Sequence, residues 1–353
     1  MPKTAPAAGI AHGALTLPSV VVDSYNLEIE DGDGFVGDRA SNSAFRGILD
    51  GWRERVAEAA REDPFGDIET KDIPKKLLDK LLLEGEPEVA GIVHSAVEEF
   101  AQEFAGVVRR FLRAKGWRDT ERIAVGGGFR ESRIAELAVG RTMALLKEHE
   151  IDVRLTPIRH HPDEAGLIGA VHLAPAWVFS GHDGMLAVDI GGSNIRAGVV
   201  KPRVKKAPDL SRAEVWRSAL WRHRDDEPTR EEAVDRLAQM LVALVEEAEG
   251  EDLRLAPFVG IGCPGVIRED GTIERGAQNL PGNWESRRFH LPDRLREAIP
   301  EIGGHETTIV LHNDAVVQGL SEVPAMADVT RWGILTVGTG LGNARFTNRR
   351  NGD

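Results

Sequence analysis

The sequence has a single cysteine, no long apolar run and no cluster of basic residues. Cys263 alone cannot form a disulfide within the chain or a zinc site that needs several cysteines. No stretch approaches the roughly 20 consecutive apolar residues of a membrane span. A net charge of −13 without a block of Lys and Arg argues against nucleic-acid binding as the main role. We therefore expect no structural zinc, no membrane partner and no nucleic-acid partner.

Length and composition indicate a globular protein of two domains. The 353 residues exceed what one core of ordinary size organises, and the 41% hydrophobic and 29% charged residues are typical of soluble proteins. Residues 1–18 contain one lysine and no long apolar core, which does not fit a secretory signal. A flexible tail is expected there, and a cytoplasmic location is the working hypothesis.

Strand and helix patterns alternate in two blocks, which predicts an α/β architecture. Apolar residues from Val93 to Phe111 recur at steps of three and four, so one face of a long helix is apolar, and Gly116 is expected to end it. Branched and alternating apolar residues predict a strand over 19–29. Further helices are expected at 42–61, 132–149, 163–175 and 231–247, and further strands at 122–125, 153–158, 215–220, 256–263 and 307–312.

Residues 185–200, "MLAVDIGGSNIRAGVV", predict a hairpin whose turn could receive a phosphate group. Gly191 and Gly192, followed by Ser193 and Asn194, allow backbone N–H groups to approach an anion. Asp189 at the end of the first strand could hold Mg²⁺ through water, because Mg²⁺ keeps part of its hydration shell. The alternative is a plain turn rich in Gly and Asn.

A second glycine-rich turn follows another predicted strand, at Gly338, Thr339 and Gly340. A hydroxyl and free N–H groups suit the outer phosphates of a nucleotide. A Gly-x-Gly-x-Gly pattern is weak by itself. Paired with the first hairpin it is stronger, because two such turns that face each other can hold one polyphosphate from both sides.

A strand ends at His312, Asn313 and Asp314. The Asp314 carboxylate could act as a general base that takes the proton of a substrate hydroxyl as its oxygen attacks phosphorus. Asn313 could bind a neighbouring hydroxyl as donor and acceptor. The alternative is that Asn313 or Asp314 simply caps the following helix.

Three further features are candidates for ligand contacts. Gly126, Gly127 and Gly128 follow a strand and would let adenine or ribose lie on the backbone, although a tight strand-to-helix turn explains them equally. The turn at Gly265 could bring backbone groups to a ligand. Asn279 could bind sugar hydroxyls. Metal binding by the adjacent histidines 160 and 161 is not expected, because no third ligand stands at a suitable spacing.

Together these stretches resemble the ROK family of sugar kinases and regulators, within the actin-like and hexokinase-like superfamily. "LAVDIGGSNIRAGVV" is similar to the family's first phosphate hairpin, and "VGIGCPGVI", "QNLPGNW", "HNDA" and "TVGTGLG" follow in family order at similar spacing. Residues 84–132 and "DEAGLIGAVHLA" resemble segments that the family places after these. The resemblance thus covers most of residues 80–353, in circularly permuted order.

The resemblance implies a two-lobed actin-like, ribonuclease H-like ATPase fold, an α/β fold with mixed sheets flanked by helices. Residues 19–177 with 330–353 would form the larger lobe, which carries the adenosine side and the second phosphate hairpin. Residues 178–183 would be a linker. Residues 184–329 would form the smaller lobe, with the first phosphate hairpin and the sugar side. A homodimer is the expectation at the level of the family.

The permuted order has a consequence for one sheet. In the family a β-meander begins at the second phosphate hairpin, and here only two of its strands follow in the chain. We expect residues 19–29 to supply the third strand, in the same sheet as residues 332–349. Zinc-containing members also carry a Glu-x-Gly-His segment that binds sugar hydroxyls, and this sequence lacks it. The acidic turn at residues 28–38 is a candidate for the same place.

The function implied by the resemblance is ATP- and Mg²⁺-dependent phosphorylation of a sugar hydroxyl, with Asp314 as general base. ATP would lie between the two hairpins with its adenosine toward Gly126–Gly128, and the sugar would contact Gly265, Asn279, Asn313 and Asp314. One alternative is a non-catalytic regulatory protein that binds sugar and nucleotide on the same fold, and another is an ATPase that uses no carbohydrate. The sugar and the choice between ATP and polyphosphate as donor stay open.

Overall fold

The computed structural model describes residues 10–32, 34–60, 62–127 and 132–349. The chain forms two compact units. Unit 1 contains residues 1–26, 159–330 and 344–353, and unit 2 contains residues 27–158 and 331–343. Residues 19–26, 159–177 and 344–353, expected in the larger lobe, belong to unit 1 in this division. None of the described helices is long and apolar enough to cross a bilayer.

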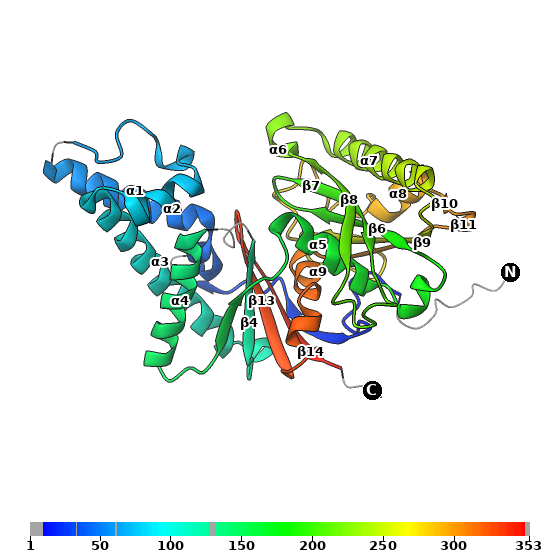
Figure 1. Ribbon diagram of the computed structural model, residues 1–353, viewed down its shortest axis with the longest axis horizontal. Helices are drawn as coiled ribbons and strands as arrows, with labels where there is room; N and C mark the ends of the chain where they lie inside the picture. The colour runs from blue at the N-terminus through cyan, green and yellow to red at the C-terminus, as the bar shows by residue number, and fades with distance from the viewer. Residues whose placement is uncertain (1–9, 33, 61, 128–131, 350–353) are drawn as a thin grey trace. The chain divides into compact units, whose positions relative to one another are not determined.

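Unit 1 is built on a five-stranded mixed sheet with the order β12-β9-β6-β7-β8 (Figure 1). The strands β6 (Gly184–Ile190), β7 (Ile195–Lys201) and β8 (Glu214–Trp221) form an antiparallel meander. The strands β9 (Leu255–Cys263) and β12 (Thr308–Asn313) run parallel to β6. Because every residue of β6 is buried, helices must cover both faces of this sheet.

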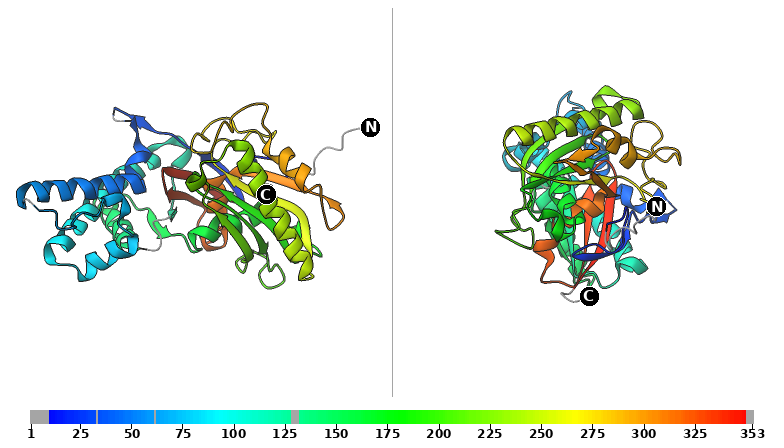
Figure 2. Two further views of the ribbon diagram at one scale, coloured as in Figure 1. Left: turned by 90° about the horizontal axis from the view of Figure 1, so that it is seen from above. Right: turned by 90° about the vertical axis from the view of Figure 1, so that its right-hand side faces the viewer.

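One face is covered by α7 (Arg230–Gly250) and α8 (Leu291–Ala298), whose apolar side chains pack with Leu186 and Val188 of β6. Figure 2 shows α7, in yellow-green, lying along this sheet. A capping box formed by the side chains and backbone of Thr229 and Glu232 begins α7. The opposite face carries α5 (Pro162–Ala170) and α9 (Asp314–Leu320). Alternate side chains of β6 point to opposite faces of the sheet, and Asp189 lies against α5, so α5 is on the face away from α7.

The helices α5 and α9 approach each other closely at a glycine. A Cβ placed on Gly169 would lie 1.7 Å from the carbonyl oxygen of Val317. One turn earlier, a Cβ on Gly166 would lie 2.5 Å from the carboxyl carbon of Asp189. The small residues predicted for this helix therefore bring its backbone against both α9 and the end of β6.

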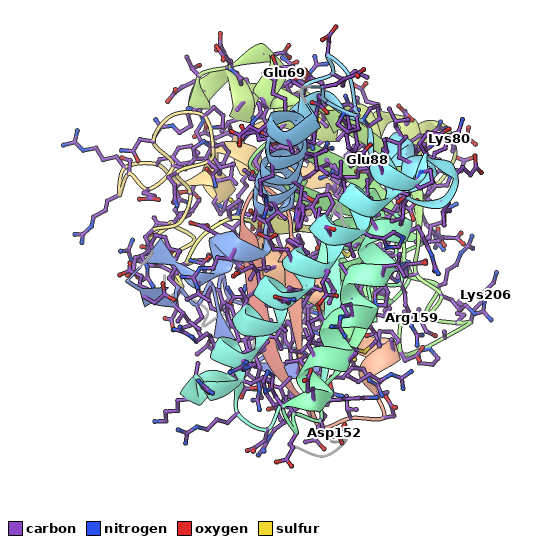
Figure 3. The ribbon with its side chains drawn as sticks, turned by 90° about the vertical axis from the view of Figure 1, so that its left-hand side faces the viewer. Glu69, Lys80, Glu88, Asp152, Arg159 and Lys206 are labelled. Atoms are coloured by element: carbon purple, nitrogen blue, oxygen red, sulfur yellow. The ribbon has the colours of Figure 1, made fainter. Side chains whose placement is uncertain are left out.

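Unit 2 contains four long helices around β4 (Arg122–Gly127), β5 (Arg154–Pro157) and β13 (Arg331–Val337). The helices are α1 (Asn42–Ala60), α2 (Lys75–Glu84), α3 (Pro87–Arg113) and α4 (Arg133–Glu148). Figure 3 views the helices of this unit, with Lys80 of α2 and Glu88 of α3 on the outer surface.

The long helix α3 has the predicted apolar face, which is buried in the core of unit 2. It ends at Arg113 rather than at Gly116. A 3-10 turn over Lys115–Trp117 follows it and buries Trp117 against Phe111, with ring centroids 5.0 Å apart. Burial of the aromatic ring thus ends the helix before the glycine.

A second five-stranded sheet has the order β1-β14-β13-β4-β5. Here β1 (Val20–Tyr25) pairs antiparallel with β14 (Leu341–Asn348), and β13, β4 and β5 are parallel to one another. This confirms that the strand near the start of the chain joins the sheet of residues 332–349. Taken as β13, β14, β1, β4 and β5, its strands have the same spatial order as β6, β7, β8, β9 and β12.

The remaining elements are short. They are the hairpins β2 (Glu30–Asp31) with β3 (Gly34–Phe35) and β10 (Glu301–Ile302) with β11 (His305–Glu306), the helix α6 (His223–Asp226), and 3-10 turns at Val36–Ala40, Thr70–Asp72, Val171–Leu173, Ala176–Phe179 and Val323–Met326. Residues 10–18, expected within a flexible tail, are instead packed in unit 1. Leu17 is 3% exposed, and Thr16 forms a β-bridge with Val21.

The close α5–α9 contact predicts that Gly169→Ala destabilises the protein by about 2 kcal/mol, because the added methyl group must push α9 away from the sheet. A thermal melt followed by circular dichroism measures this. The matched control is Gly140→Ala in α4, where an added Cβ meets nothing within 4 Å. That change should be neutral or slightly stabilising, since alanine favours helix. Equal melting temperatures for the two variants would contradict the proposed packing.

Candidate functional site

Two carboxylates lie at the same edge of the unit 1 sheet, at the ends of parallel strands. Asp189 is near the end of β6, and Asp314 follows β12 directly. Strand β9 lies between them, and its Gly262 is in register with both Asp189 and His312. Asp189 and Asp314 are thus two strand spacings apart across the sheet, which places their Cα atoms roughly 10 Å from each other. The structure therefore brings together the predicted metal-side and base-side carboxylates.

Asp189 is buried, at 5% exposed, and its charge is compensated from the neighbouring strand. Arg196 of β7 donates from Nη1 to its Oδ2 at 3.2 Å, and the same guanidinium donates from Nε to Asp163 at 2.9 Å. Burial raises the pKa of Asp189, while Arg196 acts in the opposite direction. The carboxylate thus depends on one cation shared with the start of α5.

Asp314 is the first residue of α9 and is partly buried. Its Oδ1 accepts a hydrogen bond from the backbone N–H of Ala315 at 2.9 Å. Burial, and after it the negative charge of Asp189, raise the pKa of Asp314 to about 7. A carboxylate with this pKa can both accept and release a proton near neutral pH, which suits general base catalysis.

Asn313 is buried and holds the turn between β12 and α9. Its Oδ1 accepts from the N–H of Val316 at 3.1 Å, which makes it the N-cap of α9. Its Nδ2 donates to the carbonyl of Gly265 at 3.0 Å. The capping interpretation is therefore confirmed for Asn313. The Asn313 amide also donates a hydrogen bond to the Asp314 carboxylate, and the predicted sugar contact stays a prediction.

The first hairpin has the expected tight turn. The N–H of Gly191 donates to the carbonyl of Asn194 at 2.8 Å, and the ring Nε2 of His223 is 2.8 Å from the carbonyl of Gly191. A Cβ on Gly192 would lie 3.0 Å from the Cβ of Asn279. Asn279 is exposed and its amide forms no hydrogen bond with the described residues. Thus a predicted phosphate-binding residue and a predicted sugar-binding residue are neighbours.

The second glycine turn lies beside the end of β4 in unit 2. Thr336 and Val337 of β13 are in register with Gly126 and Gly127. Gly127 has φ +83°, and a Cβ there would lie 2.3 Å from the carbonyl oxygen of Val337, so no other residue fits. The N–H of Gly338 bonds to the carbonyl of Gly340 at 3.0 Å to form the turn around Thr339. Gly128 lies outside the described residues.

A pocket of about 140 Å³ opens next to this turn, and sequence reasoning did not find it. The backbone N–H of Asn42 in its lining donates to the carbonyl of Gly338 at 3.0 Å, which fixes the pocket against the glycine turn. Apolar side chains and two cations line it: Asn42, Phe45, Arg46, Lys75, Leu78, Ser132 and Ile134. These residues come from three helices, and no local spacing could have linked them.

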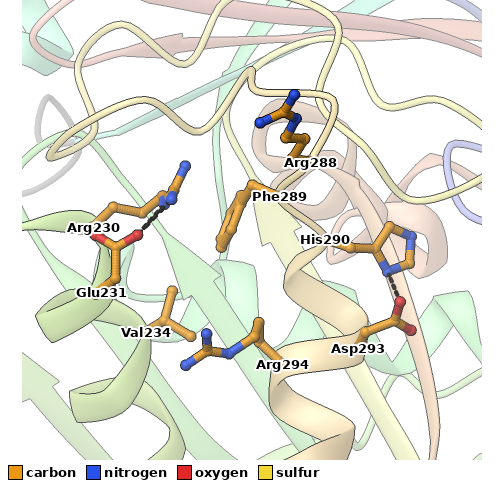
Figure 4. Close-up of a pocket in the computed structure, with 8 residues that line it drawn as sticks. All are labelled: Arg230, Glu231, Val234, Arg288, Phe289, His290, Asp293 and Arg294. Carbon is orange, nitrogen blue, oxygen red and sulfur yellow. Dashed lines mark hydrogen bonds and ion pairs between the residues drawn. The ribbon is translucent and has the colours of Figure 1, made fainter.

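A second pocket, of about 260 Å³, lies between the starts of α7 and α8 (Figure 4). The guanidinium groups of Arg230 and Arg294 lie on two sides of the Phe289 ring, which Arg230 overlies at 4.4 Å. Arg230 is also paired with Glu231, and it donates to the carbonyl of Asn283. Arg230 therefore supports the turn that follows Asn279, and both Arg230 and Arg294 have acidic partners.

The side chains around Asp189 and Asp314 determine whether Mg²⁺ could bind at this edge of the sheet. No group of three or more His, Cys, Asp or Glu in the described part of the chain is arranged to hold a metal directly. Arg196 takes one oxygen of Asp189, so the other oxygen is left for an ion, either directly or through a water of the Mg²⁺ hydration shell. Two carboxylates at one sheet edge, each with a raised pKa, also favour a cation near them. The donor set fits a hydrated Mg²⁺.

Other sequence features have structural partners. The Nδ1 of His161 accepts a hydrogen bond from the N–H of Asp163 and so caps α5. The acidic turn at residues 28–38 places Asp31 against Arg39, at 2.5 Å, and Arg110, at 3.2 Å. Burial raises the pKa of the Cys263 thiol well above its usual range. Each of these groups thus has a structural partner or is buried, and the role of the acidic turn in sugar binding stays a prediction.

Sequence reasoning missed Arg196 and His223. Arg196 is a charged residue within the otherwise apolar strand "IRAGVV", and a charge in a buried strand was a signal that a partner such as Asp189 lies beside it. His223 lies in a polar stretch after β8, with no pattern that links it to Gly191.

Comparison with known proteins gives one family match. The model of the ROK family matches residues 185–351. A comparison with curated proteins returned no match. Among solved structures, the Lmo2764 protein of Listeria monocytogenes, a proposed N-acetylmannosamine kinase, is 25% identical with a TM-score of 0.32, over 47% of each chain.

Two solved structures from Cytophaga hutchinsonii are also similar. A proposed sugar kinase is 20% identical, with a TM-score of 0.30, over 47% of this chain and 48% of the other. An exopolyphosphatase is 17% identical, with a TM-score of 0.23, over 51% and 52% of the two chains. The chain thus spans about half the length of these structures.

Because Arg196 is shared by Asp163 and Asp189, we predict that Arg196→Met lowers the free energy of unfolding by an amount that depends on pH. Without Arg196, the buried Asp189 carboxylate loses its partner, and we expect a loss of about 3 kcal/mol at pH 8. The loss should shrink toward pH 4, because Asp189, whose pKa is already raised, then becomes neutral. Chemical unfolding at both pH values measures this. The control Arg203→Met breaks an exposed pair with Glu214 and should cost no more than about 1 kcal/mol.

Proposed function

We propose that the chain, whose residues 185–351 match the model of the ROK family, belongs to this family and transfers a phosphoryl group from ATP to a hydroxyl group of a sugar. The observation that carries the proposal is the pair of carboxylates at the edge of the unit 1 sheet. Burial and the charge of Asp189 raise the pKa of Asp314 to about 7, and Asp189 lies on the far side of β9, two strand spacings away. Phosphoryl transfer to an alcohol requires a group that accepts the proton of the hydroxyl and a group that holds the metal ion. Asp314 and Asp189 would fill these two roles.

Asp314 is the general base of the proposed reaction. As the hydroxyl oxygen of the sugar forms its bond to the γ-phosphorus of ATP, its proton passes to the Asp314 carboxylate. The bond between the γ-phosphorus and the bridging oxygen breaks, and its electron pair leaves with ADP. The hydrogen bond from Ala315 to Oδ1 orients the carboxylate, so that Oδ2 is left to take the proton.

The two glycine turns would each offer backbone N–H groups to phosphate oxygens, at Gly191–Asn194 and at Gly338–Gly340. The pocket beside Gly338 would take the adenosine, with Phe45 and Leu78 against the base. Asp189 would hold Mg²⁺ through water, and the ion would supply positive charge to the phosphate oxygens. Arg196 keeps Asp189 ionised for this task, because it opposes the rise in the pKa of that carboxyl group.

The sugar would lie on Asn279, the amide of Asn313, the backbone of Gly265, and Asp314. Asn279 supports this, because it is exposed, has no partner among the described residues and touches the phosphate hairpin at Gly192. Arg230 stabilises the turn after it through the Asn283 carbonyl. The sugar, the choice between ATP and polyphosphate, and a homodimer stay predictions.

The circular permutation is also part of the proposal. The common strand order of the two sheets supports it. In the unit 1 sheet, the strands β6, β7, β8, β9 and β12 follow one another along the chain. In the second sheet, the strand that corresponds to β8 is β1, from near the start of the chain.

We predict that Asp314→Asn lowers turnover about 10²–10⁴-fold, because the amide cannot accept the proton, while ATP binding changes little. A coupled assay of ADP release across hexoses, N-acetylhexosamines and polyols, with ATP and polyphosphate as alternative donors, measures turnover. Calorimetry measures ATP binding. The matched control is Asp235→Asn on the exposed face of α7, which should keep wild-type turnover.

Two results would overturn parts of this proposal. Wild-type turnover in Asp314→Asn would remove the general base. Sugar binding without turnover in the wild-type protein, with either donor, would favour the non-catalytic binding protein.

The raised pKa of Asp314 predicts one pH effect on turnover and one on stability. Turnover should rise as the pH increases through about 7, since the base acts when ionised. Its folded pKa is above the unfolded value of about 3.9, so the carboxyl group stabilises the fold when protonated, and this stability is lost as the pH rises through about 7. The melting temperature of Asp314→Asn should therefore exceed that of the wild type by a few degrees at pH 8 and by less at pH 4. A constant difference between pH 4 and pH 8 would exclude the raised pKa.

A further inference from the structure

Residues His12–Leu17, here called the strap, turn at His12 and Gly13 and lie along one side of unit 1. Strand β12 is at the end of its sheet, so none of the described strands pairs with its outer edge. The strap covers this edge. The N–H of Gly13 donates to the carbonyl of Leu311 at 2.9 Å, and the N–H of Leu311 donates to the ring Nδ1 of His12 at 3.1 Å.

His312 links the strap to the residues that precede Asp314. Its ring is fully buried, with Nε2 3.1 Å from the carbonyl of Ala14. Its Nδ1 lies 2.7 Å from the backbone N–H of Asn313, from which it accepts a hydrogen bond. This arrangement requires a neutral ring with its proton on Nε2, so that the strap carbonyl accepts from His312.

The strap also contacts the loop that carries Gly265. A Cβ on Gly13, which has φ +57°, would lie 2.3 Å from the carbonyl oxygen of Ile267. Tyr25 packs edge-on against the His312 ring, with centroids 5.4 Å apart, and its hydroxyl donates to the same Ile267 carbonyl at 3.4 Å. The strap and Tyr25 thus contact both the loop of Gly265 and the end of β12, the two segments that the Asn313 side chain connects.

We propose that the strap positions Asp314, and that His312 is the positioning residue through which it acts. The path runs from the Ala14 carbonyl through the His312 ring to the N–H of Asn313, and Asn313 then caps the helix that Asp314 begins. Neither the strap nor His312 touches the reacting atoms. The inference rests on the proposed function in one respect, namely that Asp314 is the base whose placement limits turnover.

Gly13→Ala tests the strap without changing the site. The new side chain must move away from the Ile267 carbonyl, and the backbone at φ +57° becomes strained. We expect kcat to fall about tenfold or more, while KM for ATP stays within about twofold, because a small displacement of a base impairs chemistry more than binding. The matched control is Gly181→Ala, at φ +82° with nothing within 4 Å of the added Cβ, which shares the backbone strain but lies outside the strap. It should leave kcat unchanged.

His312 is tested by a pair of substitutions. His312→Ala removes both hydrogen bonds, whereas His312→Gln keeps a donor that can reach the Ala14 carbonyl. A folded His312→Gln with kcat between those of the wild type and His312→Ala supports the path. Equal losses in the two variants at equal melting temperature would overturn it, because packing alone would then explain the effect.

A readout without turnover separates this inference from the proposed function. Hydrogen exchange followed by mass spectrometry should show faster exchange at residues 311–316 in Gly13→Ala, and no such change in Gly181→Ala. If the wild-type protein turns over no sugar, the proposed function fails while the exchange result still decides whether the strap holds this segment. Unchanged exchange at residues 311–316 or an unchanged kcat in a folded Gly13→Ala would overturn the strap proposal.

Discussion

The site depends on the cost of holding two carboxylates close together at the end of one sheet. Burial raises the pKa of both Asp189 and Asp314, and the negative charge of Asp189 adds to the effect on Asp314. Arg196 opposes this effect at Asp189, whereas no cation among the described residues lowers the pKa of Asp314 in this way. This unequal compensation favours the charged form of Asp189 and fits the different tasks proposed for the two groups. The surrounding glycine contacts and helix caps keep both groups at that edge.

The small residues of α5 set the geometry on which this charge arrangement rests. Gly166 lets the helix backbone lie against the Asp189 carboxylate, and Gly169 lets it lie against α9. The start of α5 also supplies Asp163, which shares Arg196 with Asp189. One short helix therefore contacts both strand ends and the cation, so a movement of α5 would change burial and charge at the site together.

Most of the fold could be predicted from the sequence, because strand ends, glycine turns and the apolar face of α3 are local patterns. The placement of β1 beside β14 was also predicted, from the family's strand order rather than from any local signal. What could not be predicted arises from contacts between distant segments. Arg196 forms a hydrogen bond with Asp163, which is 33 positions away in the sequence. The pocket around Phe45 is lined by residues of three helices. The sequence predicts Asn313 as a cap of the following helix, which the structure confirms, and its contact with the distant Gly265 had no local signal.

The strap also has a consequence for how chains behave toward one another. An uncovered outer edge of β12 would present a row of free N–H and carbonyl groups, and such edges pair readily with strands of other chains. Only a few residues around Gly13 prevent this, through two hydrogen bonds to Leu311. A loosened strap would therefore favour self-association by strand addition, so the same short segment protects the colloidal stability of the folded protein.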